Sequence, residues 1–379
     1  MAYIYDAPGR IAFGAGALNT LPDAINSFGA KKVLFVTDPG MIKIGLADRT
    51  MKLMEDAGIE FELFDGCTGE PSDTIIGALA NVLKDGGFDI IVALGGGSVM
   101  DAAKAANILV ANGGCIEDYE GVDKAKKAGI PLIVIVTTAG TGSEVENTFI
   151  IYSAKLNRKM VLVSMFAVPS YSICDPELTL TLPPQLTLGP GMDALAHAME
   201  SYLSKGSSPI SEIYALKAMN LIYNNLAECV NNGSNLEART NQLLGSMLAG
   251  SAMSNSGCGV CHAIAAPLGA YFHVSHGNAC AILLPQAMKF NAPAVPQKMI
   301  EMGVAMGMGS AEELTPDIVV DNIFKLAKEC HMPGLSDFGV SLDKISEDFI
   351  TEAVEEFSST CNPREVKRED ILPFIEACL

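Results

Sequence analysis

Four residues in the second half of the chain have types and spacing that suit a metal ion. Asp193 and His197 are four residues apart in GMDALAHAMESY, and His262 and His276 follow in GVCHAIAAPLGAYFHVSHGNA. Side chains four residues apart project from one face of a helix, so the first pair could hold an ion that the later histidines enclose. Three imidazoles and one carboxylate favour Fe(II) or Zn(II) over Ca(II) or Mg(II), which prefer oxygen ligands. A coordination position left open for substrate would make the site catalytic.

A second motif overlaps this set of residues. Cys258-Gly-Val-Cys261-His262 fits the C-x-x-C-H pattern of covalent haem attachment, and a C-x-x-C pair can also be redox-active or bind zinc. Haem attachment of this kind belongs to exported proteins, whereas the chain opens MAYIYDAPGR, without the basic and apolar regions of a leader. We therefore interpret the two cysteines as apolar filler that precedes a ligand helix.

Composition limits the possible classes of protein. A chain of 379 residues is long enough for two domains, and 49% hydrophobic with 18% charged residues describes a globular protein. A net charge of −19 disfavours a nucleic-acid partner, because the chain would repel phosphates. Ten cysteines without framework spacing predict reduced thiols, and no apolar run approaches the ~20 residues that span a membrane. We expect a soluble cytoplasmic protein.

The pattern of apolar residues changes about halfway along the chain. Up to residue 182, short β-branched runs alternate with helical patterns, which predicts a parallel α/β sheet covered on both faces. The expected strands are VLFVTD (33–38), FELFDG (61–66), DIIVALGGGS (89–98) and IPLIVIVTTAGTG (130–142), and FIIYS with KMVLVS (149–164) resembles a hairpin added to that sheet. After the prolines of LTLTLPPQLTLGPG (178–191) the pattern becomes helical. We predict a Rossmann-like α/β domain over residues 1–182 and an all-α domain over 183–379.

Two glycine-rich strand ends in the first half suit a nucleotide. Gly95-Gly96-Gly97-Ser98 closes a buried strand and opens the helix expected near Asp101. Glycines allow close approach of a pyrophosphate, and the start of a helix offers free N–H donors. TTAGTGSEV (137–145) is another such strand end, and two of these loops can face one ligand. The G-x-G-x-x-G fingerprint is absent, so a purely steric role for these glycines stays open.

Asp38 ends the strand VLFVTD. A carboxylate at the end of a parallel strand can accept hydrogen bonds from a ribose diol and repel a 2′-phosphate. The alternative is an aspartate that initiates the turn at Pro39-Gly40. Both interpretations remain open at this point.

Taken together, these motifs resemble the iron-containing (group III) alcohol dehydrogenase family, of the lactaldehyde/propanediol and short-chain alcohol type. The resemblance covers nearly the whole chain and rests on VTD near 38, GGGSxxDxAK at 95–104, TTAGTGSE at 137–144, the metal segments and CNPRE at 361–365. It implies an NAD(H)-dependent oxidoreductase that interconverts a short-chain alcohol or diol and its aldehyde, with Fe(II), or alternatively Zn(II), as Lewis acid. It also implies a homodimer or larger homo-oligomer.

The resemblance assigns roles to particular residues. Asp193, His197, His262 and His276 would bind the metal, and Asp38 would favour NAD over NADP. The other residues expected at the cofactor are Gly96, Gly97, Ser98, Thr137, Thr138, Thr141, Ser143 and Lys159. Asp101 also matches a motif position, although it could instead cap its helix. An alcohol loses a proton as its carbon loses hydride, so the metal would stabilise an alkoxide while nicotinamide lies within ~3–3.5 Å of that carbon.

One position departs from the family pattern. Many relatives have a further histidine four residues after the first histidine of the PLGA segment, a proposed proton-relay residue, and Ala266 stands there in this chain. We expect His273, three residues before His276, to relay the proton, or otherwise a cofactor ribose hydroxyl with water. The alternative for His273 is a surface or pocket-lining histidine without a role in the reaction. The same architecture also serves zinc-dependent glycerol dehydrogenases and non-redox, NAD-using sugar-phosphate cyclases. The helical half lacks the obvious basic cluster that a phosphorylated substrate would need.

Overall fold

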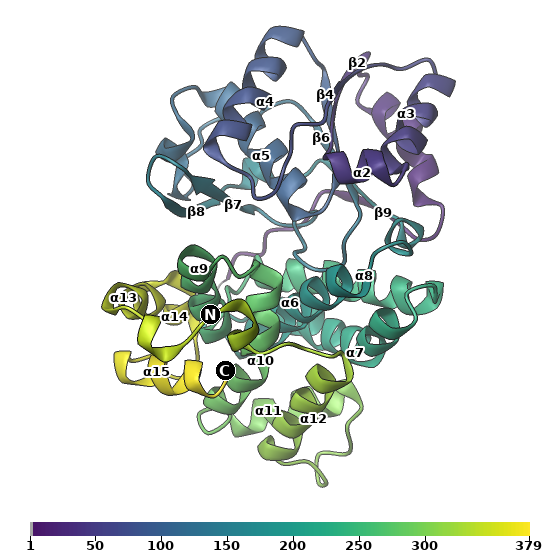
Figure 1. Cartoon of the computed structure of the whole chain (residues 1–379). Coiled ribbons are helices and arrows are strands. Elements are labelled where there is room, and N and C mark those ends of the chain that lie inside the picture. Colours follow the sequence, from purple (N-terminus) through teal and green to yellow (C-terminus); the bar gives the residue numbers. More distant parts are fainter. Residues whose placement is uncertain (1–2) are drawn as a thin grey trace. The chain divides into compact units, whose positions relative to one another are not determined.

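The computed structural model describes residues 3–379, which form two compact units (Figure 1). The α/β unit comprises residues 6–138 and 142–180, and the helical unit comprises residues 3–5, 139–141 and 181–379. The fold class predicted from the sequence, a parallel α/β half followed by a helical half, is confirmed.

A six-stranded parallel sheet forms the centre of the α/β unit, in the order β1-β9-β6-β4-β2-β3. Its strands are β1 (Arg10–Phe13), β2 (Lys32–Val36), β3 (Glu60–Phe64), β4 (Ile90–Gly95), β6 (Leu132–Val136) and β9 (Tyr171–Cys174). From β2 the chain runs outward to β3 and then returns to place β4 on the other side of β2. The strand order therefore reverses between β2 and β4, and open α/β sheets bind ligands at such a point.

Helices cover both faces of this sheet (Figure 1). Helices α1 (Leu21–Ser27) and α3 (Leu46–Asp56) pack on one face, against alternate strand residues that include Val33, Phe35 and Val92. Helices α4 (Asp73–Gly86) and α5 (Gly97–Asn112) lie on the other face. Because both faces are covered, β2, β4 and β6 are apolar without alternation. Short elements complete the unit: η1 (Ala17–Thr20), α2 (Pro39–Lys43), η2 (Ile116–Tyr119), η3 (Met165–Ala167) and η4 (Pro176–Thr179).

The expected hairpin forms, but it does not join the main sheet. Strands β7 (Thr148–Ser153) and β8 (Arg158–Val163) pair antiparallel in a separate sheet, ordered β5-β8-β7, with β5 (Gly121–Val122). The prediction of an addition to the main sheet is wrong because β9 takes the position beside β6. Alternate residues of β7 are buried, as expected for a strand covered on one face only.

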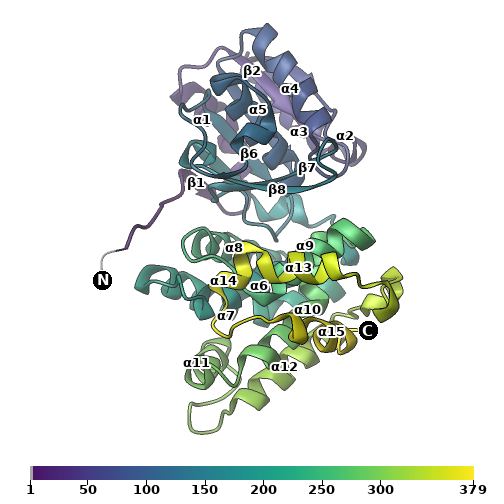
Figure 2. The same ribbon diagram turned by 90° about the vertical axis from the view of Figure 1, so that its left-hand side faces the viewer.

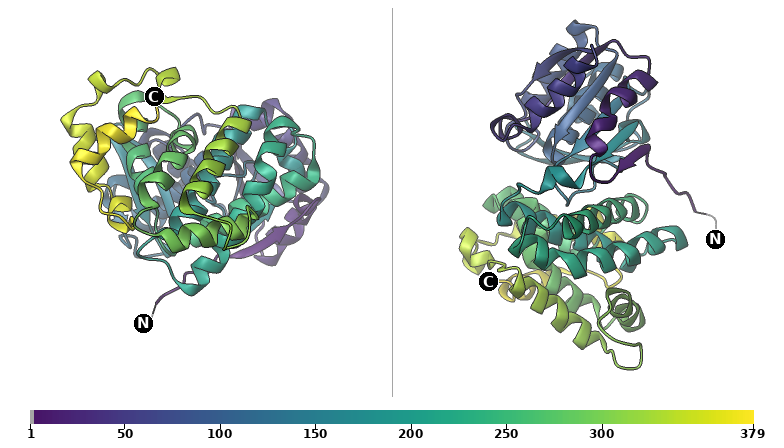
Figure 3. Two further views of the ribbon diagram at one scale, coloured as in Figure 1. Left: turned by 90° about the horizontal axis from the view of Figure 1, so that it is seen from below. Right: turned by 90° about the vertical axis from the view of Figure 1, so that its right-hand side faces the viewer.

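The helical unit is built around α6 (Pro184–Leu203), which packs against α7, α8 and α10 (Figures 2 and 3). Every residue from Gly191 to Leu203 is buried, so this stretch is enclosed on all sides rather than along one stripe. The other helices are α7 (Pro209–Asn231), α8 (Leu236–Met253), α9 (Val260–Phe272), α10 (His276–Asn291), α11 (Pro296–Met306), α12 (Pro316–Glu329), η5 (Leu335–Phe338), η6 (Leu342–Lys344), α13 (Glu347–Glu355), α14 (Phe357–Cys361) and α15 (Arg368–Glu376). Within residues 3–379, no helix has both the length and the apolar character needed to cross a membrane.

The prolines expected to precede the helical pattern lie largely inside α6. Pro184 is the first residue of the helix, where the missing N–H has no partner to lose. Pro190 lies in its interior, where its missing N–H leaves the carbonyl of Leu186 without the usual partner. The helix therefore begins earlier than the proline-rich sequence predicts.

Candidate functional site

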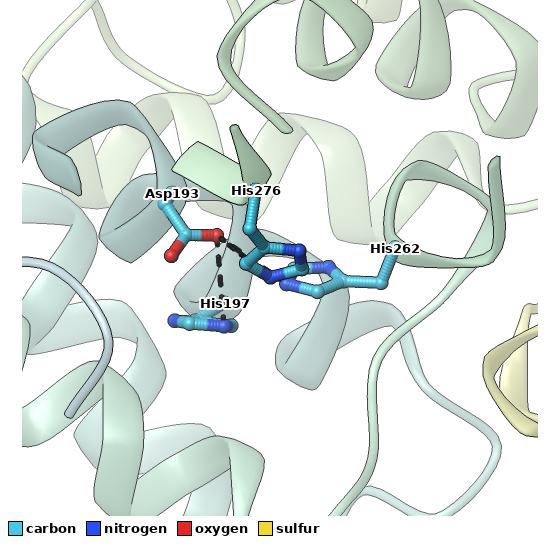
Figure 4. Close-up of side chains that lie close together, drawn as sticks. All are labelled: Asp193, His197, His262 and His276. Carbon is cyan, nitrogen blue, oxygen red and sulfur yellow. Dashed lines mark ion pairs between the residues drawn. The ribbon is translucent and has the colours of Figure 1, made fainter. Parts of the chain in front are cut away.

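Three helices of the helical unit bring the four predicted metal ligands together (Figure 4). Asp193 and His197 lie one turn apart on α6, His262 lies in the first turn of α9, and His276 is the first residue of α10. Each of the four offers a ligand atom, and all these atoms lie within 4.8 Å of one another. The spacing of the residues in the sequence predicted this convergence.

The Asp193 carboxylate is the centre of the cluster. Its Oδ1 atom lies 3.7 Å from Nε2 of His197, 3.5 Å from Nε2 of His262 and 3.8 Å from Nε2 of His276. Asp193 Oδ1 and His262 Nε2 are buried and lack a hydrogen-bond partner. Buried polar atoms are normally satisfied, so two that face each other without a hydrogen bond fit a site for a cation. The donor set, three imidazole nitrogens and one carboxylate oxygen, suits Fe(II) or Zn(II).

Electrostatics around the cluster favour an ionised Asp193 and neutral imidazole at His197. Burial alone would raise the pKa of Asp193, but the neighbouring His197, His276 and His262 together hold it well below its ordinary value. Burial lowers the pKa of His197. A metal needs ligands in these protonation states.

Close backbone contact brings α6 and α10 together beside the cluster. A Cβ atom added to Gly277 would lie 2.9 Å from the carbonyl carbon of Gly189 and 3.1 Å from the nitrogen of Pro190. A side chain at Gly277 would therefore force the two helices apart. Because His276 immediately precedes Gly277, this contact sets the distance between His276 and the ligands on α6.

The cysteines of the C-x-x-C-H motif are buried free thiols. Burial raises the pKa of Cys258 to about 11 and that of Cys261 to about 12. The Cys261 thiol donates to the carbonyl of Cys280 at 3.3 Å. Thiols held protonated in this way suit packing rather than redox or ligand chemistry, as the sequence interpretation expected.

In the α/β unit, predicted cofactor residues gather at the carboxyl ends of β2, β4 and β6. The Thr37 hydroxyl at the end of β2 donates to the carbonyl of Leu94 in β4 at 2.9 Å. A Cβ added to Gly95 would lie 3.4 Å from Oδ2 of Asp38, and one added to Gly96 would lie 3.1 Å from Oγ1 of Thr138. Asp38 and Thr138 thus flank the glycine loop where the strand order reverses.

One of the two roles weighed for Asp38 from the sequence, that of turn initiation, is present in the structure. Asp38 does initiate a turn, since its Oδ1 accepts from the backbone N–H groups of Gly40 (2.7 Å) and Met41 (3.1 Å). That bonding uses Oδ1, while Oδ2 points toward Gly95. Helix α5 begins at Gly97, directly after Gly96, and its start carries Gly97 and Ser98 without a side-chain cap.

Asp101 does not cap its helix, because Gly96 is the N-cap residue and Asp101 lies one turn inside α5. Its Oδ1 accepts from the Ser143 hydroxyl at 2.7 Å, and its Oδ2 accepts from the N–H of Ile150 at 3.0 Å. Lys104, also on α5, donates to Ser143 Oγ at 2.9 Å and to the carbonyls of Glu146 and Thr148. This network links the helix of the glycine loop to β7, so the Ser143 hydroxyl is engaged inside the protein.

Of the other predicted cofactor residues, Thr137 lies at this edge, directly after β6, whereas Lys159 and Thr141 lie on other segments. Thr137 is buried, and its hydroxyl lacks a hydrogen-bond partner. Lys159 lies on β8, where its ammonium group lies 2.5 Å from Oε1 of Glu70. Thr141 belongs to the short segment grouped with the helical unit.

The predicted proton relay lies at the end of α9. His273 is exposed and ends the helix in the left-handed conformation, with φ of 56°. Ala266, the departure from the family pattern, lies on α9 one turn after His262. Sequence reasoning missed two buried charged residues, Lys104 and Glu200. Glu200 lies one turn beyond His197 on α6, and its oxygens meet the start of α9.

Comparison with known proteins identifies the class as alcohol dehydrogenases, a class of oxidoreductases. Residues 8–176 match the model for iron-containing alcohol dehydrogenase, and residues 187–379 match the C-terminal model of the Fe-containing alcohol dehydrogenase family. The chain therefore belongs to the iron-containing alcohol dehydrogenase family, and the resemblance seen in its motifs is confirmed.

Individual relatives extend over the whole chain. The 1,3-propanediol dehydrogenase of Citrobacter freundii is 36% identical over 97% of this chain and 96% of its own length. A solved 1,3-propanediol oxidoreductase superposes with a TM-score of 0.96 at 33% identity, with full coverage of both chains. A sulfoacetaldehyde reductase from Bifidobacterium kashiwanohense, solved in complex with NAD+, has a TM-score of 0.89 at 30% identity, covering 100% of this chain and 99% of its own.

Proposed function

We propose that the protein is an NAD(H)- and Fe(II)-dependent dehydrogenase that interconverts a short-chain primary alcohol or diol and its aldehyde. The observation that carries this proposal is the meeting of three imidazole nitrogens at the buried, unpartnered Oδ1 of Asp193. Asp193, His197, His262 and His276 would hold the metal. When bound, the ion would supply a Lewis acid that stabilises the alkoxide form of the alcohol.

The protein's own residues would keep water from this chemistry. Asp193, His197 and His262 are at most 8% exposed, whereas the side chain of His276 is 30% exposed. Substrate would therefore approach on the side of His276. Exclusion of water strengthens the interaction of each charge with the reacting oxygen.

We propose that the α/β unit binds NAD(H) at the reversal point of its sheet. Gly96, Gly97 and Ser98 would contact the pyrophosphate, Thr137 and Thr138 would flank it, and Asp38 would accept from the ribose hydroxyls. Thr141, Ser143 and Lys159 complete the residues proposed for the cofactor. The free Oδ2 of Asp38 beside Gly95 supports this assignment, as does the NAD+ complex of the related sulfoacetaldehyde reductase. A negative charge there favours NAD over NADP.

For the proton of the alcohol, we propose His273 as the relay, since Ala266 carries no titratable group. The exposed position of His273 would let it pass the proton to solvent. A short alcohol or diol is the proposed substrate because the related propanediol enzymes resemble this chain over its full length.

Metal analysis and turnover measured on the same preparation test the proposal. Protein purified without oxygen should contain close to one iron per chain and oxidise NADH with propanal or 3-hydroxypropanal, and chelation followed by Fe(II) should abolish and restore turnover. If turnover returned with Zn(II) and not with Fe(II), the metal of the proposed enzyme would be zinc instead of iron. If the protein turned over no short aldehyde but acted on a phosphorylated sugar acid, the proposed dehydrogenase function would be wrong and a cyclase function would be indicated.

We also propose a homodimer or larger homo-oligomer in a reducing compartment such as the cytoplasm. All ten cysteines are free thiols, which supports such a compartment. Light scattering should give at least twice the chain mass of 39.9 kDa, and the mass of a single chain would contradict the proposed oligomer.

A further inference from the structure

Glu200 is a buried carboxylate on α6, 1% exposed, and it lies on the helix face that carries Asp193 and His197. It is not itself one of the four convergent ligands. Its oxygens face α9 instead, where four N–H groups converge on them. An acidic side chain buried this deeply needs such donors, because burial without them would be costly.

The first contact of Glu200 is with the ring of a proposed metal ligand. Its Oε2 lies 2.7 Å from Nδ1 of His262. An ionised carboxylate can only accept, so Nδ1 of His262 carries the hydrogen. In the neutral ring, the form that binds a metal, Nε2 then keeps the lone pair. That Nε2 is the buried, unpartnered atom facing Asp193.

The second contact is with the backbone at the start of α9. The N–H groups of Gly259 (3.0 Å), Cys261 (2.7 Å) and His262 (3.4 Å) donate to Glu200. Gly259, the N-cap residue, has no side chain to cap the helix itself. A Cβ at Gly259 would lie 2.8 Å from Oε1 of Glu200, so the glycine makes room for the carboxylate. Glu200 therefore caps α9 from another helix.

A neighbouring residue caps the same turn without touching the ring. Asn362 Oδ1 accepts from the N–H of Val260 at 3.1 Å and from Asn291 at 2.9 Å. Asn362 is completely buried. The first turn of α9 is thus held by two side chains, of which only Glu200 also bonds His262.

We propose that Glu200 is a positioning residue for the metal, which fixes both the tautomer of His262 and the turn of α9 that carries it. The inference rests on the proposed role of His262 as a metal ligand. Glu200 also adds a second buried carboxylate to that of Asp193, so two acidic groups match the charge of a divalent ion. Loss of a partner of this kind typically weakens metal binding by about 10–100-fold.

The test is titration of metal-free protein with Co(II), following its visible absorption, and with Zn(II) by calorimetry. Glu200→Gln should bind both ions about 10–100-fold more weakly and should alter the Co(II) spectrum. The glutamine amide has one oxygen instead of two, so its NH₂ group would face N–H donors of α9 that the carboxylate now accepts from. The matched control is Asn362→Ala, which loosens the same turn but leaves the His262 ring bonded. It should lower the melting temperature while keeping Co(II) affinity within about threefold and the spectrum unchanged.

Two results would overturn the proposal. One is wild-type affinity and spectrum in Glu200→Gln, and the other is an equal loss of affinity in Asn362→Ala, which would make the role structural only. If Glu200→Gln does not fold, Glu200→Asp keeps the charge but cannot span both contacts, so wild-type binding by that variant overturns the proposal as well. Normal Co(II) binding by Asp193→Asn would instead refute the metal site of the proposed function.

Discussion

Nε2 of His262 and Oδ1 of Asp193 lie 3.5 Å apart, and both atoms are buried without a hydrogen bond. This pair predicts the behaviour of Asp193→Asn. The amide loses the negative charge at the centre of the cluster, so metal affinity should fall by at least ~100-fold, the upper end of the effect of outer partners. Iron content after anaerobic purification measures this loss. Asp321→Asn, an exposed change on α12, should retain full iron; equal iron in both variants would contradict the assignment.

Asp38→Asn separates the two roles of Asp38. Asparagine keeps an oxygen that can cap α2, so the variant should fold with wild-type stability, but it lacks the charge that repels a 2′-phosphate. The ratio of kcat/KM for NADH to that for NADPH should fall by about 10-fold or more, roughly 1.4 kcal/mol. Steady-state kinetics with both cofactors measure it. An unchanged ratio would leave Asp38 with its turn role alone.

Gly96→Ala tests the proposed pyrophosphate loop. The new Cβ would lie 3.1 Å from Thr138 Oγ1, so the loop must shift, and NADH affinity measured by fluorescence should fall about 10-fold or more. Gly77→Ala on α4 is the matched control, since its Cβ would meet no atom within 4 Å. That control should keep NADH affinity and raise stability by about 0.5–1 kcal/mol. Unaltered NADH binding by Gly96→Ala would argue against the loop.

His273→Asn removes the proposed relay while respecting the left-handed backbone, which asparagine tolerates. If His273 moves the proton, kcat for alcohol oxidation should fall by about 100-fold, and the pH profile should lose one limb. Profiles of kcat against pH for both proteins decide the question. The same turnover and profile in the variant would assign the proton to a ribose hydroxyl with water.

Glu144 predicts a pH dependence of stability. Burial raises its pKa to about 7, against the opposing effects of its own backbone N–H and of Lys104. The pKa of Glu144 is higher in the folded than in the unfolded protein. The contribution of this carboxyl to the free energy of unfolding is therefore complete below about pH 4.5 and is lost as the pH rises through about 7. The Glu144→Gln variant cannot ionise at this position. Its free energy of unfolding should therefore rise relative to that of the wild type by up to about 3 kcal/mol as the pH increases from about 4.5 to about 7.

Denaturant unfolding at pH 5 and pH 8 measures the difference between the two proteins. Glu60→Gln, an exposed carboxylate on β3, provides the comparison without burial. If the difference in free energy of unfolding between Glu144→Gln and the wild type were the same at both pH values, the Glu144 carboxyl would not titrate in this range.

Strands with a long apolar run could be predicted from the sequence, whereas two short ones could not. β2, β4 and β6 are buried on both faces and stand out as continuous apolar segments. β1 and β9 have four residues each, RIAF and YSIC, too few to show a period. They become strands because the sheet offers them parallel partners. Long-range pairing of this kind leaves no local signal.

The ligands of the candidate site were predictable because Asp193 and His197 have helical spacing and histidines are rare in this chain. Glu200 could have been found by the same rule, since it lies three residues after His197. The burial of Lys104 could not, because its partners, Ser143 and the carbonyls near β7, lie about forty residues away in the sequence. Only the folded hairpin shows why a lysine is tolerated there.

The sharing of α6 by Asp193, His197 and Glu200 limits how this protein can change in length. One inserted residue between positions 193 and 200 rotates everything after it by about 100°, which would remove both a proposed ligand and the carboxylate that holds His262. A substitution in this stretch is a local change, whereas an insertion or deletion removes several functions at once. Variation in chain length among descendants of this gene should therefore be confined to the loops, and α6 should be inherited as an uninterrupted block.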